Sequence, residues 1–334
     1  MSQVEGRTRF FAGKALRYGI TLVIILTINF AIPRAMPGDP MINLLGDEAV
    51  RIDSQMLDEL RAQYGLDRPV QDQYIEYVLG AGRLDFGYSI HKNLKVTDLI
   101  YDRLFWTLVL IFPSIAIGGL LALVLGALAG FRHGSKVDRL LTGTSILMYT
   151  CPSFLFAMIV VTIFSFHLGW FPLGNISSGK TQGFAYLLDI GWHLFLPVAI
   201  LATFEAAYIF LVVRNSITQI MGEYFIFVAK AKGLPSRVIE LRHVMRNVLP
   251  QFISIMALNF GFTVSGALII EIVFSLNGMG TLIYDAVMSR DYPVLQGAFV
   301  FLTIFILAAN FLADVLYGIV DPRIGDSTNA GKRI

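Results

Sequence analysis

The chain has 334 residues, of which 55% are hydrophobic and only 15% charged, with a mean hydropathy of +0.66. Soluble domains carry about a quarter charged residues and lack long uncharged runs, so this composition excludes an ordinary soluble protein. The net charge of +2 is too small to indicate a nucleic-acid partner.

Six apolar runs approach or exceed the length that a helix needs to cross the hydrocarbon core of a bilayer, about 20 residues. A buried helix in a large soluble protein explains one such run but not six, because 334 residues cannot cover six apolar faces. The predicted fold class is therefore an all-α membrane protein with six transmembrane helices. The runs are 18–33, 107–131, 140–166, 194–213, 252–270 and 294–313.

The first run is short, but Arg17 and Arg34 flank it and their long side chains can extend to the two interfaces. A basic flank and a short apolar core are also typical of a secretory signal peptide. Because Pro33-Arg-Ala-Met-Pro37 follows, without a small-x-small cleavage site at the end of the run, we expect a retained helix.

Residues 35–104 lie between the first two spans and are predicted to form a small helical subdomain outside the membrane. One helix is predicted to begin at Asp53 or Ser54 and to reach Gln63 or Tyr64, with Gly65 ending it. A second helix is predicted over 70–79, and a third from Thr97 into the second span. The subdomain either packs over the mouth of the helix bundle or docks an external partner, and both interpretations remain open.

Glycines and prolines have specific places within the spans. Glycines of the second span suit close helix packing, and prolines kink spans or begin them. The glycines are Gly118, Gly119, Gly126 and Gly130, and the prolines are Pro113, Pro152 and Pro197.

Ionisable residues inside a membrane are energetically costly, so each is a functional hypothesis. Glu205, near the middle of the fourth span, is the strongest candidate for lining a pathway; the alternative is a carboxyl group bonded to hydroxyls of neighbouring helices. Asn259 is the second pathway-lining candidate, and it and Asn310 can also cross-link helices. Glu271 and Asp314 lie near the ends of their spans, where a structural role is favoured.

The segment 214–250 is predicted to be a long basic loop. Within it, Glu223 to Lys232 are predicted to form a helix that Gly233 ends. A short helix with aromatic and small residues either lies on the lipid surface or inserts into a groove of another protein.

Basic residues gather on one side of the predicted membrane. The two short loops on the opposite side carry only Lys180 and Arg290. Positive charge in short loops remains in the cytoplasm, so both termini are predicted to be cytoplasmic, in a multi-pass protein of the inner cell membrane. The basic segments are 1–17, 132–139, 214–250 and 319–334.

The sequence carries no recognisable catalytic motif. It contains no Gly-x-x-x-x-Gly-Lys-[Ser/Thr] phosphate loop, no Gly-x-Ser-x-Gly and no His-Glu-x-x-His. The five histidines form no His-x-x-x-His pair, and Cys151 is the single cysteine, so neither a metal site nor an intramolecular disulfide is predicted. We therefore expect a protein that is not an enzyme and has no cofactor of its own.

The loop reads Glu223-Tyr-Phe-Ile-Phe-Val-Ala-Lys-Ala-Lys-Gly233-Leu, followed by His243-Val-Met-Arg-Asn-Val-Leu-Pro250. It resembles the EAA loop of ABC importer permeases, especially the first-permease (B-type) branch of the dipeptide/oligopeptide/nickel family. It departs from the general motif because Tyr224 and Phe225 follow the glutamate. Further matches occur in the same order over about residues 15 to 323. They are Pro37-Gly-Asp-Pro40, Tyr64-Gly-Leu-Asp-Arg-Pro69, Asp85-Phe-Gly-Tyr-Ser89, Glu271-Ile-Val-Phe274, Gly278-Met-Gly280, Arg290-Asp-Tyr-Pro293, Gln296-Gly297 and Asp321-Pro-Arg323.

The resemblance implies a permease subunit of an ATP-driven importer with the type I fold. Such a chain forms half of a pathway for di- or oligopeptides, beside a second permease. Two cytoplasmic ATPase subunits bind ATP and Mg, and an external solute-binding protein delivers the substrate. The coupling helix that contacts an ATPase subunit would involve Glu223, Tyr224, Ala229, Ala231, Lys232 and Gly233.

The implied organisation comprises a cytoplasmic tail, a first span, an external subdomain, a five-span core that contains the coupling loop, and a second cytoplasmic tail. Alternatives are the same transporter class carrying nickel complexes or oligosaccharides, or a secondary transporter. The latter is disfavoured because only Glu205 fits a midplane charge and the halves show no symmetry. The parts are 1–17, 18–34, 35–104, 105–318 with the loop 214–250, and 319–334.

Overall fold

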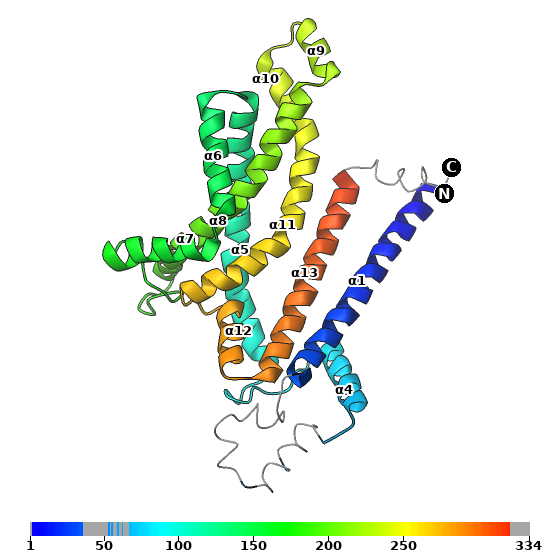
Figure 1. Cartoon of the computed structure of the whole chain (residues 1–334), viewed down its shortest axis with the longest axis vertical. Helices are drawn as coiled ribbons and strands as arrows, with labels where there is room; N and C mark the ends of the chain where they lie inside the picture. The colour runs from blue at the N-terminus through cyan, green and yellow to red at the C-terminus, as the bar shows by residue number, and fades with distance from the viewer. Residues whose placement is uncertain are drawn as a thin grey trace. The chain divides into compact units, whose positions relative to one another are not determined.

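The computed structural model describes residues 2–35, 53, 55, 59, 62 and 67–320, and the side chains of 13–32, 34, 53, 55, 59, 62 and 67–311. The motifs at 37–40 and 321–323 and the side chain of Asp314 lie outside this part, and so does the helix predicted from Asp53 or Ser54 to Gln63 or Tyr64, apart from four single residues. The chain divides into two compact units, which are described separately (Figure 1). The first is built mainly from Thr107–Leu276, and the second from Phe11–Trp106 with Asn277–Leu307.

Five helices in the described part are long and apolar enough to cross a membrane, in agreement with five of the six predicted spans. The fourth of them includes two short segments that precede α11, namely α10 (Ser236–Val238) and a π-helical stretch (Ile239–Val244). The five helices are α1 (Ser2–Ala35), α5 (Val96–Phe131), α8 (Phe184–Met221), α11 (Met245–Val273) and α13 (Tyr292–Val320).

The third predicted span is not straight. It consists of α6 (Lys136–Thr150) and α7 (Ser153–Val160), which a π-helical stretch (Val161–His167) extends, and the two halves meet at 100°. The bend lies at Cys151-Pro152, where Cys151 has an extended backbone with ψ of 132°. Proline disfavours helical geometry in the residue before it, so the helix stops there. Pro152 thus breaks this span, whereas Pro113 and Pro197 lie inside continuous helices.

Small residues of α5 bring this helix close to α8 in the first unit. A Cβ atom at Gly118 would lie 2.8 Å from the carbonyl oxygen of Ala202, and one at Gly126 would lie 2.8 Å from Cγ1 of Val213. Gly130 faces α8 in the same way. The close packing predicted from these glycines is confirmed.

The predicted loop 214–250 is mostly helical in the structure, so the helices extend beyond the apolar runs. Helix α8 continues to Met221, and α11 already begins at Met245. Between them lie α9 (Tyr224–Ala231) and α10, which form the tip at one end of α8 and α11 (Figure 1). Hydropathy failed to find the helix ends because a helix continues beyond the lipid without needing apolar side chains.

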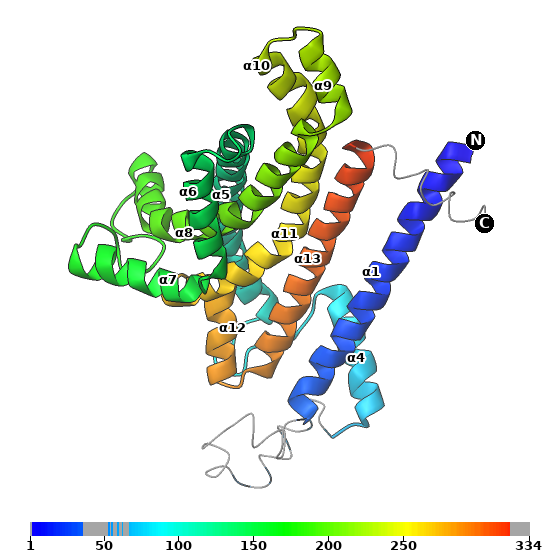
Figure 2. The same cartoon turned by 45° about the horizontal axis from the view of Figure 1, so that its top comes forward.

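In the second unit, α4 (Val70–Arg83) lies beside the end of α1 in both views (Figures 1 and 2). It was predicted to end at Leu79 but runs one turn further, to a left-handed Leu84 with φ of 58°. Asn29 of α1 donates hydrogen bonds to the hydroxyl oxygen of Tyr77 at 2.9 Å and to the carbonyl oxygen of Gln296 at 3.0 Å. Burial raises the pKa of Tyr77 to about 12.

Two of the short motifs in the second unit meet in space. Ser89 donates a hydrogen bond of 2.5 Å to Asp291, which is 2% exposed and precedes α13. A Cβ atom at Gly297 would lie 2.6 Å from Cγ1 of Val96, so this glycine allows α13 to approach the start of α5. The motifs around residues 85–89 and 290–297 therefore form one packed junction, which α12 (Met279–Met288) precedes in the chain.

Candidate coupling helix and pathway site

Helix α9 has the limits that the sequence predicts. Its N-terminal cap is Glu223, and after Lys232 the chain turns at Gly233, whose φ of +74° lies in the left-handed region. The N–H of Gly233 donates to the carbonyl oxygen of Lys230 at 2.9 Å, and that of Leu234 donates to Ala229 at 3.3 Å. These bonds satisfy carbonyl groups that the helix end would otherwise leave unpaired. The predicted glycine stop is confirmed.

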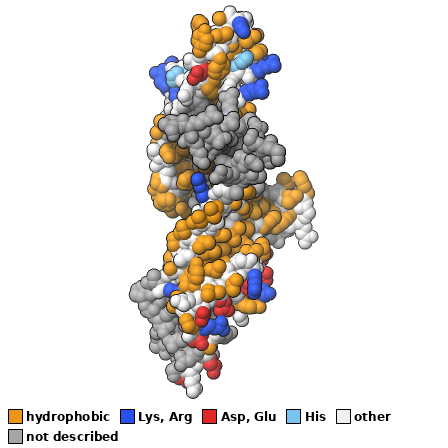
Figure 3. Space-filling view, turned by 90° about the vertical axis from the view of Figure 1, so that its right-hand side faces the viewer, with side chains coloured by type: hydrophobic (Ala, Val, Ile, Leu, Met, Phe, Trp, Pro, Cys, Tyr) orange, Lys and Arg blue, Asp and Glu red, His pale blue; other side chains and the backbone are white. Residues whose placement is uncertain are grey.

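Helix α9 has one buried face and one exposed aromatic face. Ile226 and Ala229 are buried in a hydrophobic cluster that also contains Ile217 of α8. On the other face, the side chains of Tyr224 and Phe227 are 78% and 68% exposed, and their rings stack with centroids 6.4 Å apart. Figure 3 shows hydrophobic side chains at this tip, with Lys and Arg side chains around them.

The structure divides the six residues proposed for coupling. Five are exposed on or beside α9, whereas Ala229 is buried in the hydrophobic cluster that contains Ile217. Ala229 therefore packs α9 against the rest of the chain, and the other five residues are available to a partner. The five exposed residues are Glu223, Tyr224, Ala231, Lys232 and Gly233.

A buried ion pair joins the start of α6 to α8. Arg214 donates two hydrogen bonds to the carboxylate of Asp138, at 2.9 and 2.8 Å, and Asp138 is only 2% exposed. The N–H of Gly134 and the hydroxyl of Thr142 also donate to this carboxylate, at 2.8 and 3.2 Å. This pair was not predicted from the sequence. Ser135, three residues before Asp138, caps α6 by accepting the N–H of Asp138, and this local pattern indicates only where α6 begins.

Glu205 and Asn259, the two predicted pathway-lining residues, lie on different helices but line one pocket of about 390 Å³. Glu205 is 5% exposed and accepts a hydrogen bond from the hydroxyl of Thr263 through Oε2. Its other oxygen, Oε1, has no hydrogen-bond partner within 3.5 Å among the described residues, and the side chain of Asn259 approaches the same carboxyl group from α11. The pocket lies between α8, α11 and the bend that joins α6 to α7. Its other lining residues are Tyr149, Cys151, Ser153, Leu201, Phe204, Tyr208, Phe262 and Gly266.

Glu271, another buried carboxylate of the spans, differs from Glu205. It is 1% exposed and accepts a hydrogen bond of 2.6 Å from the hydroxyl of Thr107. This bond links α11 to α5, so Glu271 has the structural contact that its place near a span end suggested.

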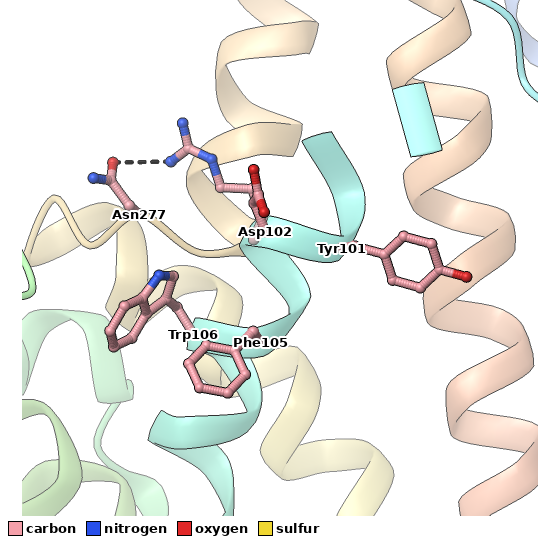
Figure 4. A pocket seen from close by; sticks show the side chains of 6 residues that line it. Tyr101, Asp102, Phe105, Trp106 and Asn277 are labelled. Carbon is pink, nitrogen blue, oxygen red and sulfur yellow. Dashed lines mark hydrogen bonds between the residues drawn. The ribbon is translucent and has the colours of Figure 1, made fainter. Parts of the chain in front are cut away.

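At the start of α5, three aromatic residues are among those that line a pocket of about 470 Å³ in the second unit (Figure 4). They are Tyr101, Phe105 and Trp106, and the pocket also contains a 2.8 Å hydrogen bond from Arg103 to Asn277. Tyrosine and tryptophan are enriched where membrane proteins cross from lipid to water. This level of α5 therefore has the composition of a membrane interface.

Among the side chains that the structure describes, which are 13–32, 34, 53, 55, 59, 62 and 67–311, no group of three or more His, Cys, Asp or Glu residues is suited to a metal ion.

Comparison with known families matches nearly the whole chain. Residues 122–326 match the binding-protein-dependent transport system inner membrane component family. Residues 7–111 match the N-terminal family of binding-protein-dependent transport system membrane components.

Known proteins give the same assignment. The chain is 33% identical to the oligopeptide transport system permease protein AppB of Bacillus subtilis, covering 91% of this chain and 95% of AppB. It is 30% identical to the dipeptide transport system permease protein DppB of Escherichia coli, over 91% and 95% of the two chains. The fold is similar to a chain of the inward-facing MetNI methionine ABC transporter, with a TM-score of 0.55 at 17% identity, covering 67% of this chain and 96% of that one. The chain belongs to the family of binding-protein-dependent transport system inner membrane components.

Proposed function

We propose that this chain is a permease subunit of an ATP-driven importer and forms half of a pathway for di- or oligopeptides. The names of its relatives, an oligopeptide and a dipeptide permease, support this substrate class. The proposed mechanism rests on one observation: α9 exposes an aromatic face, while its opposite face is buried in the hydrophobic core of this chain.

The packing of α9 against α8 couples a displacement of α9 to a displacement of the spans. Ile226 is fully buried against the cluster that includes Ile217 of α8, so α9 moves together with α8. From Met221 to Glu205, α8 is continuous and free of proline, which corresponds to about 24 Å at 1.5 Å per residue. Displacement of α9 by a partner thus shifts the wall of the pocket around Glu205.

Membership of the family supports the partners that we propose. The 334 residues contain no phosphate loop, so in this proposal ATP and Mg are bound by two separate cytoplasmic ATPase subunits. A second permease completes the pathway, and an external solute-binding protein docks on the subdomain within 35–104. The chain lies in the inner membrane with both termini and α9 in the cytoplasm, and it is not an enzyme itself.

Removal of the aromatic face of α9 tests the coupling role. We expect Tyr224→Ala and Phe227→Ala each to weaken binding of the ATPase subunit by about 2 kcal/mol, because exposed aromatic side chains dominate protein interfaces. In proteoliposomes that contain the complete importer, ATP-driven peptide uptake should fall in both variants. Co-purification of the ATPase subunits measures the lost contact directly.

The matched control is Leu147→Ala on α6, where the leucine is 62% exposed but distant in sequence from α9. It should retain uptake and co-purification. Full ATPase binding by both aromatic variants would contradict the coupling role, and peptide uptake that persists without ATP would identify a secondary transporter.

Gly233 offers an independent test of the turn after α9. We expect Gly233→Val to cost about 1–2 kcal/mol at this left-handed position and to reduce coupled uptake. Because asparagine tolerates the left-handed region, Gly233→Asn should retain most of the uptake. No atom lies within 4 Å of a Cβ at Gly233, so crowding does not contribute, and equal uptake by both variants would exclude the conformational requirement.

A further inference from the structure

The pocket around Glu205 combines one carboxylate with aromatic walls. Tyr149 of α6 and Tyr208 of α8 stack with ring centroids 5.5 Å apart, and Phe204 and Phe262 complete the apolar lining. Asn259 and Thr263 add neutral polar groups from α11.

Glu205 is the unsatisfied group of this pocket. Only 5% of Glu205 is exposed, and Oε1 has no hydrogen-bond partner within 3.5 Å among the described residues. An unpaired buried charge costs several kcal/mol, and a buried acceptor without a donor also carries a penalty. A cation with N–H donors that enters the pocket removes both costs.

The lining favours an organic ammonium group over a metal ion. Calcium takes six to eight oxygen ligands, whereas the pocket offers a single carboxylate and, in the described part of the chain, no metal-binding group of three acidic, His or Cys side chains. Aromatic faces attract ammonium groups by cation–π interaction. We propose that Glu205 binds the protonated amino group of the transported substrate as it passes through the pathway.

This inference rests on the proposed function and narrows it, because it makes the permease itself selective for substrates with a free amine. A carboxylate that pairs with the amine inside the pathway holds the substrate by its N-terminal end, while the aromatic walls accept side chains of different shapes. Selection at this point adds to any selection by the solute-binding protein.

Chemical labelling tests the site without requiring transport. The complete importer in lipid nanodiscs is treated with dicyclohexylcarbodiimide, which modifies carboxyl groups in apolar surroundings, and labelling of Glu205 is followed by peptide mass mapping. We expect n-butylammonium chloride and trialanine to slow this labelling about tenfold, the effect of one charge-assisted hydrogen bond. N-acetyl-trialanine and NaCl at equal concentration should have no effect.

Glu271 serves as the internal control, because its carboxylate is already bonded to Thr107 and it does not line the pocket. Its labelling should not respond to amines. Equal protection of Glu205 by NaCl would assign the site to an inorganic cation, and protection by none of the probes, or no labelling of Glu205 at all, would also overturn the proposal.

Uptake by proteoliposomes gives the second measurement. We expect Glu205→Gln to reduce trialanine uptake about tenfold while changing N-acetyl-trialanine uptake less than about twofold. Glu271→Gln should leave the ratio of the two uptakes unchanged. Absence of peptide uptake in the unmodified importer would contradict the proposed function alone, since protection by n-butylammonium still reports on the site. Peptide uptake by an importer in which amines do not slow the labelling of Glu205 would contradict the proposed amine site but not the proposed function.

Discussion

Replacing Asp138 by asparagine is expected to lower the free energy of unfolding by about 3–5 kcal/mol. The change leaves Arg214 with 18% of its side chain exposed and no charge partner in place of its two hydrogen bonds to the carboxylate. It also weakens the bonds that the carboxylate accepts from Gly134 and Thr142. Titration of the purified permease with SDS in mixed micelles, followed by circular dichroism, measures the loss.

An exposed ion pair of the same chain provides the matched control. Arg68 and Glu76 are 3.0 Å apart, with side chains 54% and 69% exposed. Water already screens this pair, so Glu76→Gln should change the free energy of unfolding by less than about 1 kcal/mol. Equal losses of unfolding free energy in the two variants would show that burial does not make the loss of one charge of an ion pair more costly.

The spans could be predicted because hydropathy reports directly on the lipid. It does not report on helix ends, since a helix continues into water at little cost. Helix α8 therefore covers Phe184–Met221 although its apolar run is only 194–213. For the third span, Pro152 predicted either a kink or the start of a helix, but the size of the bend depends on packing that no local pattern records.

The candidate sites differ in how far residues close together in the sequence determine their structure. The limits of α9 follow from Glu223 and Gly233, which lie ten residues apart, so the sequence was sufficient. Which face of α9 is buried was not predictable, because Ile226 and Phe227 are both apolar and only the cluster with α8 distinguishes them.

Long-range pairs explain what sequence reasoning missed. Asp138 and Arg214 are 76 residues apart, and Ser89 and Asp291 are 202 apart, so neither hydrogen-bonded pair has a local pattern. Glu205 was noticed because a carboxyl group within a span is costly. Its place beside Asn259 in one pocket depends on the packing of α8 against α11, which brings together residues that lie far apart in the sequence.

Replacing Gly126 by leucine is expected to lower the free energy of unfolding by about 3 kcal/mol through overpacking. The new Cβ would lie 2.8 Å from Cγ1 of Val213 and 3.2 Å from the carbonyl oxygen of Phe210. Val213 is fully buried, so it has no open space to move into. Helix α5 must then separate from α8, and the same SDS titration measures the cost.

The same substitution at Gly143 separates crowding from helix propensity. Gly143 lies in α6, is exposed, and has no atom within 4 Å of the added Cβ. Because leucine is a better helix former than glycine, Gly143→Leu should stabilise the permease by up to about 1 kcal/mol. The two variants thus shift stability in opposite directions if α5 and α8 are in close contact, and a stabilising Gly126→Leu would contradict that contact. Because a Cβ at Gly118 would lie 2.8 Å from Cβ of Glu205, separation of these helices should also displace the pocket and reduce peptide uptake.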